Sequence, residues 1–218
     1  TKHLLGADQI GRDILSRLIY GARVSMIVGL AATAIALVGA TTVGVPSGYF
    51  GGKYDIVMQR FVDAWMSFPG LIILLSVLSI SGQGMLPIVL VLGILGGIGS
   101  SRILRGAVIG IKENDYFLAA RAIGSPTRRT MMRHIMPNIM PIMIIIFSTG
   151  IGGMIMAEAG LSFLGFGLPP GDASWGGMLS HEGRKYMERK PELAVYPGLC
   201  LSVVVFGTNM FGDAMRDL

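Results

Sequence analysis

The strongest constraint on the fold comes from long apolar stretches that carry no charged residue. Residues 24–45, 64–101 and 135–157 contain no aspartate, glutamate, lysine or arginine. A transmembrane helix needs about 20 predominantly apolar residues to cross a hydrocarbon layer of about 30 Å. The chain is therefore expected to be an all-α, polytopic bundle of transmembrane helices.

Composition favours a membrane protein over a soluble one. Hydrophobic residues make up 52% of the 218 residues and charged residues 14%, whereas soluble domains carry about 25% charged residues. The 32 glycines are typical of transmembrane helices whose backbones pack closely. The net charge of +5 could indicate nucleic acid, but the basic residues lie in short loops beside apolar stretches, where membrane topology explains them. The single cysteine, Cys200, excludes an intrachain disulfide.

Five visible spans are expected, at residues 24–45, 56–80, 85–104, 138–157 and 193–211. Pro46 and the glycines after it should end the first span. Pro69 should kink the second, because proline cannot donate the i→i−4 hydrogen bond. Residues 81–84 predict a tight turn, which makes the third span an antiparallel neighbour of the second. Gly93 and Gly97 form a small-xxx-small pair, which predicts a close-packing face on the third span.

Charged residues mark the expected ends of these spans. Residues 1–23 are polar with an apolar stripe at helical spacing, which predicts an amphipathic helix lying at the membrane interface. The third span should end at Arg102, and Glu158 should close the fourth. Asp63 lies within the second span, and a carboxylate there can mark a functional site. Pairing with Arg60, three residues earlier, is the simpler explanation.

A polar, basic segment at residues 113–137 separates the third and fourth spans and must lie in water. Asp115 can cap a helix that begins at Tyr116, and Gly124 can end that helix in a left-handed conformation. One face of the helix, at i, i+3, i+4 and i+7 spacing, consists of Tyr116, Ala119, Ala120 and Ile123. The small alanines would let another surface approach the backbone, with Tyr116 and Phe117 as anchors. The alternative is a solvated loop whose arginines only hold it in the cytoplasm.

A second helix is expected in the same segment. Ser125 would cap it and Pro126 would occupy its first position. It would end near Pro137, after a group of basic residues formed by Arg128, Arg129, Arg133 and His134.

Residues 118–137 resemble the cytoplasmic loop of permease subunits of ATP-binding-cassette (ABC) importers. The pattern of that loop is Glu-Ala-Ala, three residues, Gly, nine residues, Ile-x-Leu-Pro. Four positions match in register, namely Ala119, Ala120, Gly124 and Pro137. Three positions depart from it, namely Leu118, His134 and Met136. Loss of the glutamate is typical of the oligopeptide/dipeptide/nickel branch of this family. Four other segments resemble the C-type subunit of the same branch, namely residues 5–25, 48–52, 60–71 and 161–179.

The resemblance implies a type I ABC importer permease fold in a bacterial or archaeal inner membrane. Such permeases usually have six spans, so one more is expected before Thr1. Lysine and arginine divide almost evenly between the two sides, and the resemblance therefore sets the orientation. It makes residues 1–23 an external amphipathic segment and residues 24–218 the permease domain. The loop at 113–137 is then cytoplasmic and the loop at 158–192 external.

The resemblance also implies partners and contact residues. The chain would pair with a homologous second permease, two ABC ATPase subunits and an external substrate-binding protein, and would carry peptides or similar small solutes. ATP and Mg²⁺ would bind the ATPase subunits, and no cofactor or metal is expected in this chain. The ATPase-docking residues would be Tyr116, Phe117, Ala119, Ala120, Ile123, Gly124 and Pro137. Contact with the binding protein is expected at Pro169, Pro170 and Trp175, and an interfacial aromatic belt at Trp175 and Tyr186.

Other classes of function fit the sequence less well. The three histidines lie outside the apolar stretches, Asp55 and Asp213 fall at span ends without a GxGD motif, and no phosphate-binding loop or metal-ligand spacing occurs. An enzyme is therefore not expected. An ATP-independent channel or secondary transporter is the alternative, although no repeated filter or charged ring is visible. Dependence on ATP would separate the two functions.

Overall fold

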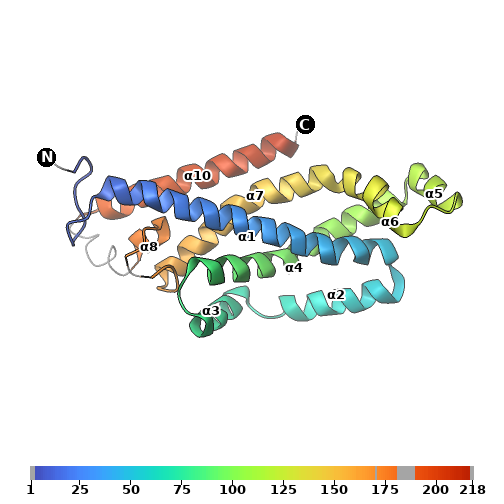
Figure 1. Ribbon diagram of the computed structural model, residues 1–218, viewed down its shortest axis with the longest axis horizontal. Helices are drawn as coiled ribbons and strands as arrows, with labels where there is room; N and C mark the ends of the chain where they lie inside the picture. Colours follow the sequence, from blue (N-terminus) through green and yellow to red (C-terminus); the bar gives the residue numbers. More distant parts are fainter. Residues whose placement is uncertain (1–2, 170, 181–189, 217–218) are drawn as a thin grey trace.

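The computed structural model describes residues 3–169, 171–180 and 190–216, and in these ranges the regular elements are helices. In chain order they are α1 (Ile14–Phe50), α2 (Gly52–Met66), α3 (Gly70–Ser81), α4 (Met85–Lys112), α5 (Asp115–Ala122), α6 (Thr127–Thr130), the π-helix η1 (Met131–Ile135), α7 (Met136–Phe163), α8 (Trp175–Leu179) and α10 (Glu192–Arg216). Helices α1, α4, α7 and α10 run along the long axis, with α5 and α6 at one end and α8 at the other (Figure 1). The expected all-α bundle is confirmed.

Four helical runs are long and apolar enough to cross a membrane: α1, α4, the continuous run Thr127–Phe163 and α10. The pair α2 and α3 adds a fifth if the two are counted as one bent span. Their axes meet at 76° across the break that contains Pro69. The kink expected there is present, and it is sharp enough to divide the predicted span into two helices.

The ends of α1 differ from the prediction. The Asp13 side chain accepts a hydrogen bond from the Ser16 N–H at 2.8 Å, which starts the helix at Ile14. Residues 14–23 therefore continue directly into the first span and are not a separate interfacial helix. Pro46 lies inside α1, and the helix ends one turn later at Phe50, followed by the C-cap residue Gly51, which has φ +63°.

Two more helices pass the charged residues that were expected to end them. Helix α4 continues past Arg102 to Lys112, and α7 continues past Glu158 to Phe163. Both side chains have partners in the fold: Arg102 pairs with Asp63 of α2, and Glu158 is hydrogen-bonded to serines. Because these charges are compensated by tertiary contacts, they do not need to lie at a helix end.

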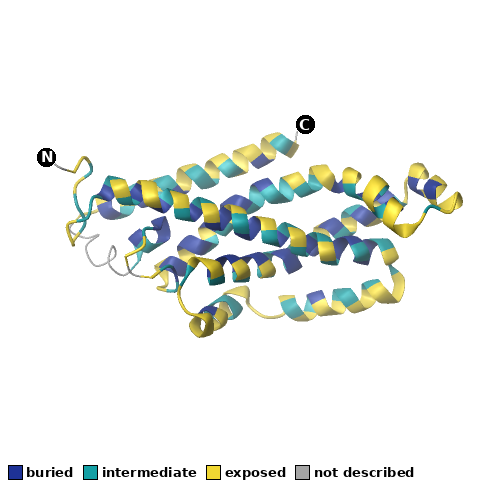
Figure 2. Cartoon of the chain, viewed as in Figure 1, coloured by how far each residue is buried: buried dark blue, intermediate teal, exposed yellow. Residues whose placement is uncertain are grey.

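The glycines of α4 bring it close to α1. A Cβ atom added at Gly93 would lie 2.7 Å from Ile35, and one at Gly97 would lie 2.8 Å from the carbonyl oxygen of Ala36. The close-packing face predicted for the third span is therefore real, and α1 is the helix that it contacts. Buried residues are concentrated along the facing sides of α1 and α4 (Figure 2).

Candidate functional site

The helix α5 begins one residue earlier than its sequence predicts. Asp115 is its first residue and Asn114 occupies the N-cap position, where its side chain makes no capping hydrogen bond. The prediction that Asp115 caps the helix is thus wrong. Its carboxylate instead lies in the first turn, where it interacts favourably with the positive end of the helix dipole.

The other end of α5 is closed as predicted. Gly124 has φ +71°, a conformation that costs a glycine little. Its N–H donates to the Arg121 carbonyl at 3.0 Å, and the Ser125 N–H donates to the Ala120 carbonyl at 3.1 Å. These two hydrogen bonds are the Schellman arrangement. They hold the chain in one fixed direction as it leaves the helix.

The side chains of α5 divide into an inner and an outer set. Phe117 is 1% exposed and Ala120 5%, so both face the bundle. Tyr116 and Ile123 are 41% and 84% exposed, and Ala119 is exposed between them. All four residues of the predicted face line one groove, although Ala120 lies deep in it, whereas Phe117 is a core residue rather than an exposed anchor.

Phe117 is part of a buried cluster to which four other elements contribute. It packs in a cluster of buried side chains that also contains Val45 of α1, Val108 and Ile111 of α4, Ile135 of η1 and Ile139 of α7. Its ring also meets the ring of Tyr49 edge to face, with centroids 6.3 Å apart. A force applied to α5 would therefore reach several helices of the bundle through one side chain.

The second helix of the segment does not start or end as predicted. It begins at Thr127, with Pro126 at the N-cap position. The hydroxyl of Ser125 is buried and has no hydrogen-bond partner in the described residues, so it is not a cap. The helix does not end at the exposed Pro137 but continues through η1 into α7. In η1 the Met136 N–H donates to the Met131 carbonyl, five residues back. This π-helical turn lies directly before Pro137, which has no N–H to donate.

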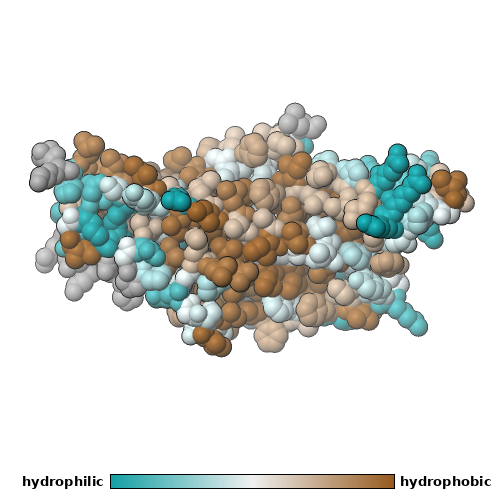
Figure 3. Space-filling model, in the orientation of Figure 1, coloured by the Kyte–Doolittle hydropathy of each residue, from teal (hydrophilic) through white to brown (hydrophobic). Residues whose placement is uncertain are grey.

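An open groove of about 610 Å³ lies between α5 and the start of the α6–η1–α7 run. Its apolar wall is formed by outward residues of α5, and the opposite wall is formed by Arg129, Arg133 and His134. The rings of Tyr116 and His134 lie 6.5 Å apart across it. Hydrophilic and hydrophobic side chains accordingly lie next to each other at this end of the molecule (Figure 3).

A network of ion pairs and hydrogen bonds ties the α1–α2 turn to α4. Arg105 donates to both carboxylate oxygens of Asp55, at 2.6 and 2.5 Å, and Ser47 donates to the same carboxylate at 2.5 Å. Lys112 donates to the carbonyl oxygens of Gly48 and Tyr49, at 3.1 and 2.9 Å, which satisfies the end of α1. Sequence reasoning missed this network, although the charges at the span ends could have indicated it.

The carboxylate of Asp63 has the predicted partner and a second one. Arg60 lies 3.6 Å from it, three residues earlier on α2. Arg102 of α4 also pairs with it. The carboxylate therefore links two helices, which the local interpretation did not include.

The residues expected to contact a binding protein are separated by the fold. Trp175 is 3% exposed and its Nε1 donates to the Leu18 carbonyl at 3.0 Å, so it belongs to the interior and to neither an aromatic belt nor a contact surface. Pro169 is exposed. Pro170 and Tyr186 lie outside the described residues.

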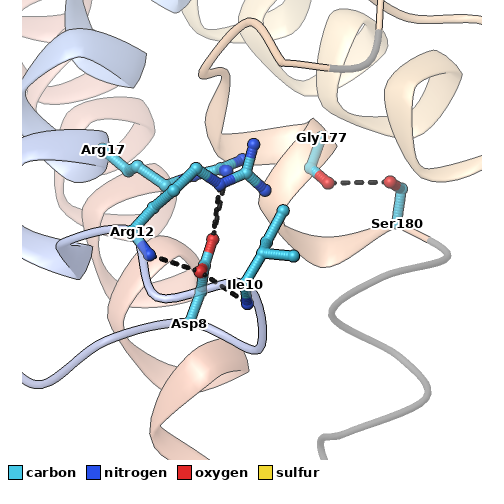
Figure 4. A network of polar contacts seen from close by, with 6 residues as sticks. All are labelled: Asp8, Ile10, Arg12, Arg17, Gly177 and Ser180. Atoms are coloured by element: carbon cyan, nitrogen blue, oxygen red, sulfur yellow. Dashed lines mark hydrogen bonds and ion pairs between the residues drawn. The ribbon is translucent and has the colours of Figure 1, made fainter.

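The end of the bundle opposite α5 contains two polar clusters. Near the N-terminus, Arg12 and Arg17 both hold the Asp8 carboxylate, at 2.8 and 3.2 Å (Figure 4). Burial by itself raises the pKa of Asp8. The hydrogen bonds that its carboxylate accepts from Arg12 outweigh this effect, so the pKa of Asp8 is below its ordinary value. In the other cluster, Glu158 is fully buried and accepts hydrogen bonds from Ser162 at 2.7 Å and Ser25 at 3.3 Å.

This bundle, with a short capped helix beyond one end, is the fold of type I ABC importer permeases. It matches a chain of the MetNI methionine ABC transporter with a TM-score of 0.70 at 16% identity, covering 94% of this chain and 96% of that one. It also matches an amino acid ABC transporter with a TM-score of 0.64 at 16% identity, covering 93% and 92%. The arrangement of the spans is thus that of a multi-span transporter chain.

The chain belongs to the family of binding-protein-dependent transport system inner membrane components, whose pattern matches residues 40–218. It is 36% identical over 215 residues to the oligopeptide permease protein OppC of Haemophilus influenzae, covering 99% of this chain and 69% of that protein. It is 35% identical over 217 residues to the glutathione permease protein GsiD of Pectobacterium atrosepticum, covering 100% and 72%. The dipeptide permease protein DppC of Alkalihalophilus pseudofirmus is 34% identical over 217 residues, covering 100% and 71%. The chain is a multi-pass transport component of an ABC importer.

Proposed function

We propose that this permease subunit imports small peptides or related solutes, and that α5 is the element on which a cytoplasmic ATPase acts. Tyr116, Ala119 and Ile123 form the exposed face that would enter a groove on the ATPase. The observation that supports this proposal most directly is the division of α5 into this exposed face and an inner face that contains the buried Phe117. A helix built in this way can bind a partner on one side and move the bundle with the other.

The mechanism rests on the rigid fastening of α5. ATP and Mg²⁺ would bind two ATPase subunits, and closure of those subunits would displace α5 as a body. Because Phe117 shares one buried cluster with side chains of α1, α4 and α7, that displacement would tilt the spans between outward- and inward-open arrangements. Transport is coupled if the solute binds these two arrangements unequally.

The solute path would lie between this chain and a homologous second permease. The solute class is supported by the relatives, whose names refer to oligopeptides, dipeptides and glutathione, all of which contain peptide bonds. An external binding protein would deliver the solute to the end of the bundle opposite α5, where Pro169 is exposed.

The docking proposal is tested by Ala119→Asp and Gly124→Leu in the complete transporter. The first places a charge on the exposed face, and the second forces a branched side chain into a left-handed backbone conformation. Both are expected to abolish substrate-stimulated ATP hydrolysis while membrane insertion stays intact. Hydrolysis in proteoliposomes and the amount of inserted protein are the two measurements.

A matched control is Ala214→Asp, which changes an exposed helical alanine of α10 in the same way and should leave hydrolysis unchanged. Wild-type stimulation in both docking variants would remove α5 from the mechanism. Solute uptake without nucleotide would favour an ATP-independent channel or secondary transporter.

A further inference from the structure

A second cavity, of about 570 Å³, opens at the end of the bundle opposite α5. Its walls come from the first turns of α1, the start of α4 and the loop before α8, which lie together in Figure 1. Val24, Ile27 and Met85 supply an apolar surface, and Tyr20 adds an aromatic ring. A volume of this size is in the range of small-molecule sites.

Two opposite charges line this cavity without pairing. Arg23 of α1 and Asp172 of the loop before α8 both border it, and neither has an ion-pair or hydrogen-bond partner for its charged group among the residues that the structure describes. By contrast, Arg17 on the same wall is held by Asp8 (Figure 4). Arg23 and Asp172 are both exposed and do not bond each other, so within the described part of the chain the open cavity has one unpaired cation and one unpaired anion on its border.

The loop that carries Asp172 is fixed to its surroundings. Ser174 caps α8 by accepting from the Gly177 N–H at 3.0 Å, and the neighbouring Trp175 is bonded to the Leu18 carbonyl. On the other side of the loop, Gln83 donates to the Gly165 carbonyl at 3.0 Å. The chain just after Asp172 is therefore joined to α1 through Trp175, which keeps this part of the loop beside the cavity.

We propose that this cavity binds both termini of a short peptide, with Arg23 at the carboxylate and Asp172 at the ammonium group. The inference rests on the proposed function, because it assigns the solute path a site for that class of solute. The apolar wall between the two charges would contact the peptide side chains without selecting among them. A solute with both termini free would then be preferred over one with either terminus blocked.

The experiment measures binding of radiolabelled dialanine to the purified transporter without nucleotide or binding protein. The transporter is held in nanodiscs of phosphatidylglycerol, whose headgroup has no ammonium. N-acetyl-dialanine and dialanine amide are the blocked probes. Since an exposed ion pair contributes at most about 1 kcal/mol, each block should weaken binding to the wild type roughly fivefold.

Substitutions of Arg23 and Asp172 test which residue binds which terminus of the peptide. Arg23→Gln should weaken the binding of dialanine roughly fivefold but should not weaken the binding of dialanine amide any further. Arg23→Lys should restore dialanine binding. Asp172→Asn should weaken dialanine but not the acetylated probe. Matched controls are Lys53→Gln and Asp213→Asn, exposed charges outside the cavity that should leave all three affinities unchanged.

Several results would overturn the inference. These are no dialanine binding to the wild type, equal binding of free and blocked probes, or wild-type affinities in Arg23→Gln and Asp172→Asn. Loss of dialanine binding in nanodiscs of phosphatidylethanolamine would assign the two charges to a lipid headgroup instead. Failure of the proposed function is distinguishable, since it would remove ATP-driven uptake while the pattern of binding remained.

Discussion

Phe117 shows how one side chain can have a different role from its neighbours on a short helix. The residues on either side of it, Tyr116 and Leu118, are 41% and 52% exposed, whereas Phe117 is 1% exposed. The proposed attachment of α5 to an ATPase would therefore depend on other residues than the attachment of α5 to the bundle. Substitutions can separate the two.

We expect Phe117→Ala to uncouple the transporter without releasing the ATPase. Truncation of a buried phenylalanine costs about 3–5 kcal/mol of packing, which would loosen α5 from α1, α4 and α7. Substrate-stimulated hydrolysis should be lost while the ATPase still co-purifies. Tyr116→Ala is the matched variant on the exposed face and should reduce co-purification instead. Identical behaviour of the two variants would show that the faces are not functionally distinct.

At the scale of elements, the pair α1 and α4 is held by close backbone approach rather than by large side chains. Gly93 and Gly97 face α1, whereas Gly99 of the same helix has open space around its Cβ position. Helix association in membranes depends on such packing, because lipid tails are as apolar as the side chains. The order of glycines along α4 therefore specifies which side meets α1.

Gly97→Val should destabilise the protein much more than Gly99→Val. Added atoms at Gly97 would overlap the Ala36 backbone, and overpacking of this kind costs about 1–3 kcal/mol. At Gly99 the same side chain has room, and both variants change helix propensity equally. Thermal unfolding in detergent measures the difference. Equal melting temperatures would mean that α1 and α4 are further apart in the membrane.

At the scale of the whole molecule, Glu158 joins distant parts of the chain at the end opposite α5. It accepts hydrogen bonds from Ser25 of α1 and from Ser162 of its own helix. Two spans are thereby tied together near the second cavity. Helices α1 and α7 contribute buried residues both to the core cluster around Phe117 and to the core cluster around Trp175, so they connect the two ends of the bundle.

We expect Glu158→Leu to lower the stability of the protein by several kcal/mol. It would leave the hydroxyls without their shared acceptor, and each unsatisfied buried hydroxyl costs about 1–3 kcal/mol. Glu158→Gln keeps an acceptor oxygen at the same place and should be tolerated far better. Thermal unfolding of the two variants in detergent provides the measurement. If the Glu158→Leu protein has the same melting temperature as the wild type, the hydrogen bonds to Glu158 do not stabilise this end of the bundle.

Much of the architecture follows from local physics and could be predicted. Charge-free apolar stretches indicate the spans, the proline at 69 breaks the helix that contains it, and Gly124 ends α5 because it accepts a positive φ. Each of these depends on a few neighbouring residues. The candidate docking segment was also found locally, from its capped polar sequence and its resemblance to a family.

Contacts between distant segments could not be predicted in the same way. Asp55 pairs with Arg105, Trp175 bonds to Leu18, and Glu158 is buried rather than placed at a helix end. Helical spacing also did not show that Phe117 is buried, because the burial of a residue on a short helix depends on how that helix packs against the bundle.

By itself, the sequence determined that this protein is a helical membrane bundle, that the chain bends at Pro69, that α5 ends at Gly124, and which family it resembles. Those properties depend on hydrophobic length and backbone conformation, which act over one or two turns. Only the tertiary structure decided which face of α5 is exposed, which charges are paired, and that Arg23 and Asp172 border one cavity. The reason is physical: burial and ion pairing depend on how helices distant in sequence pack together.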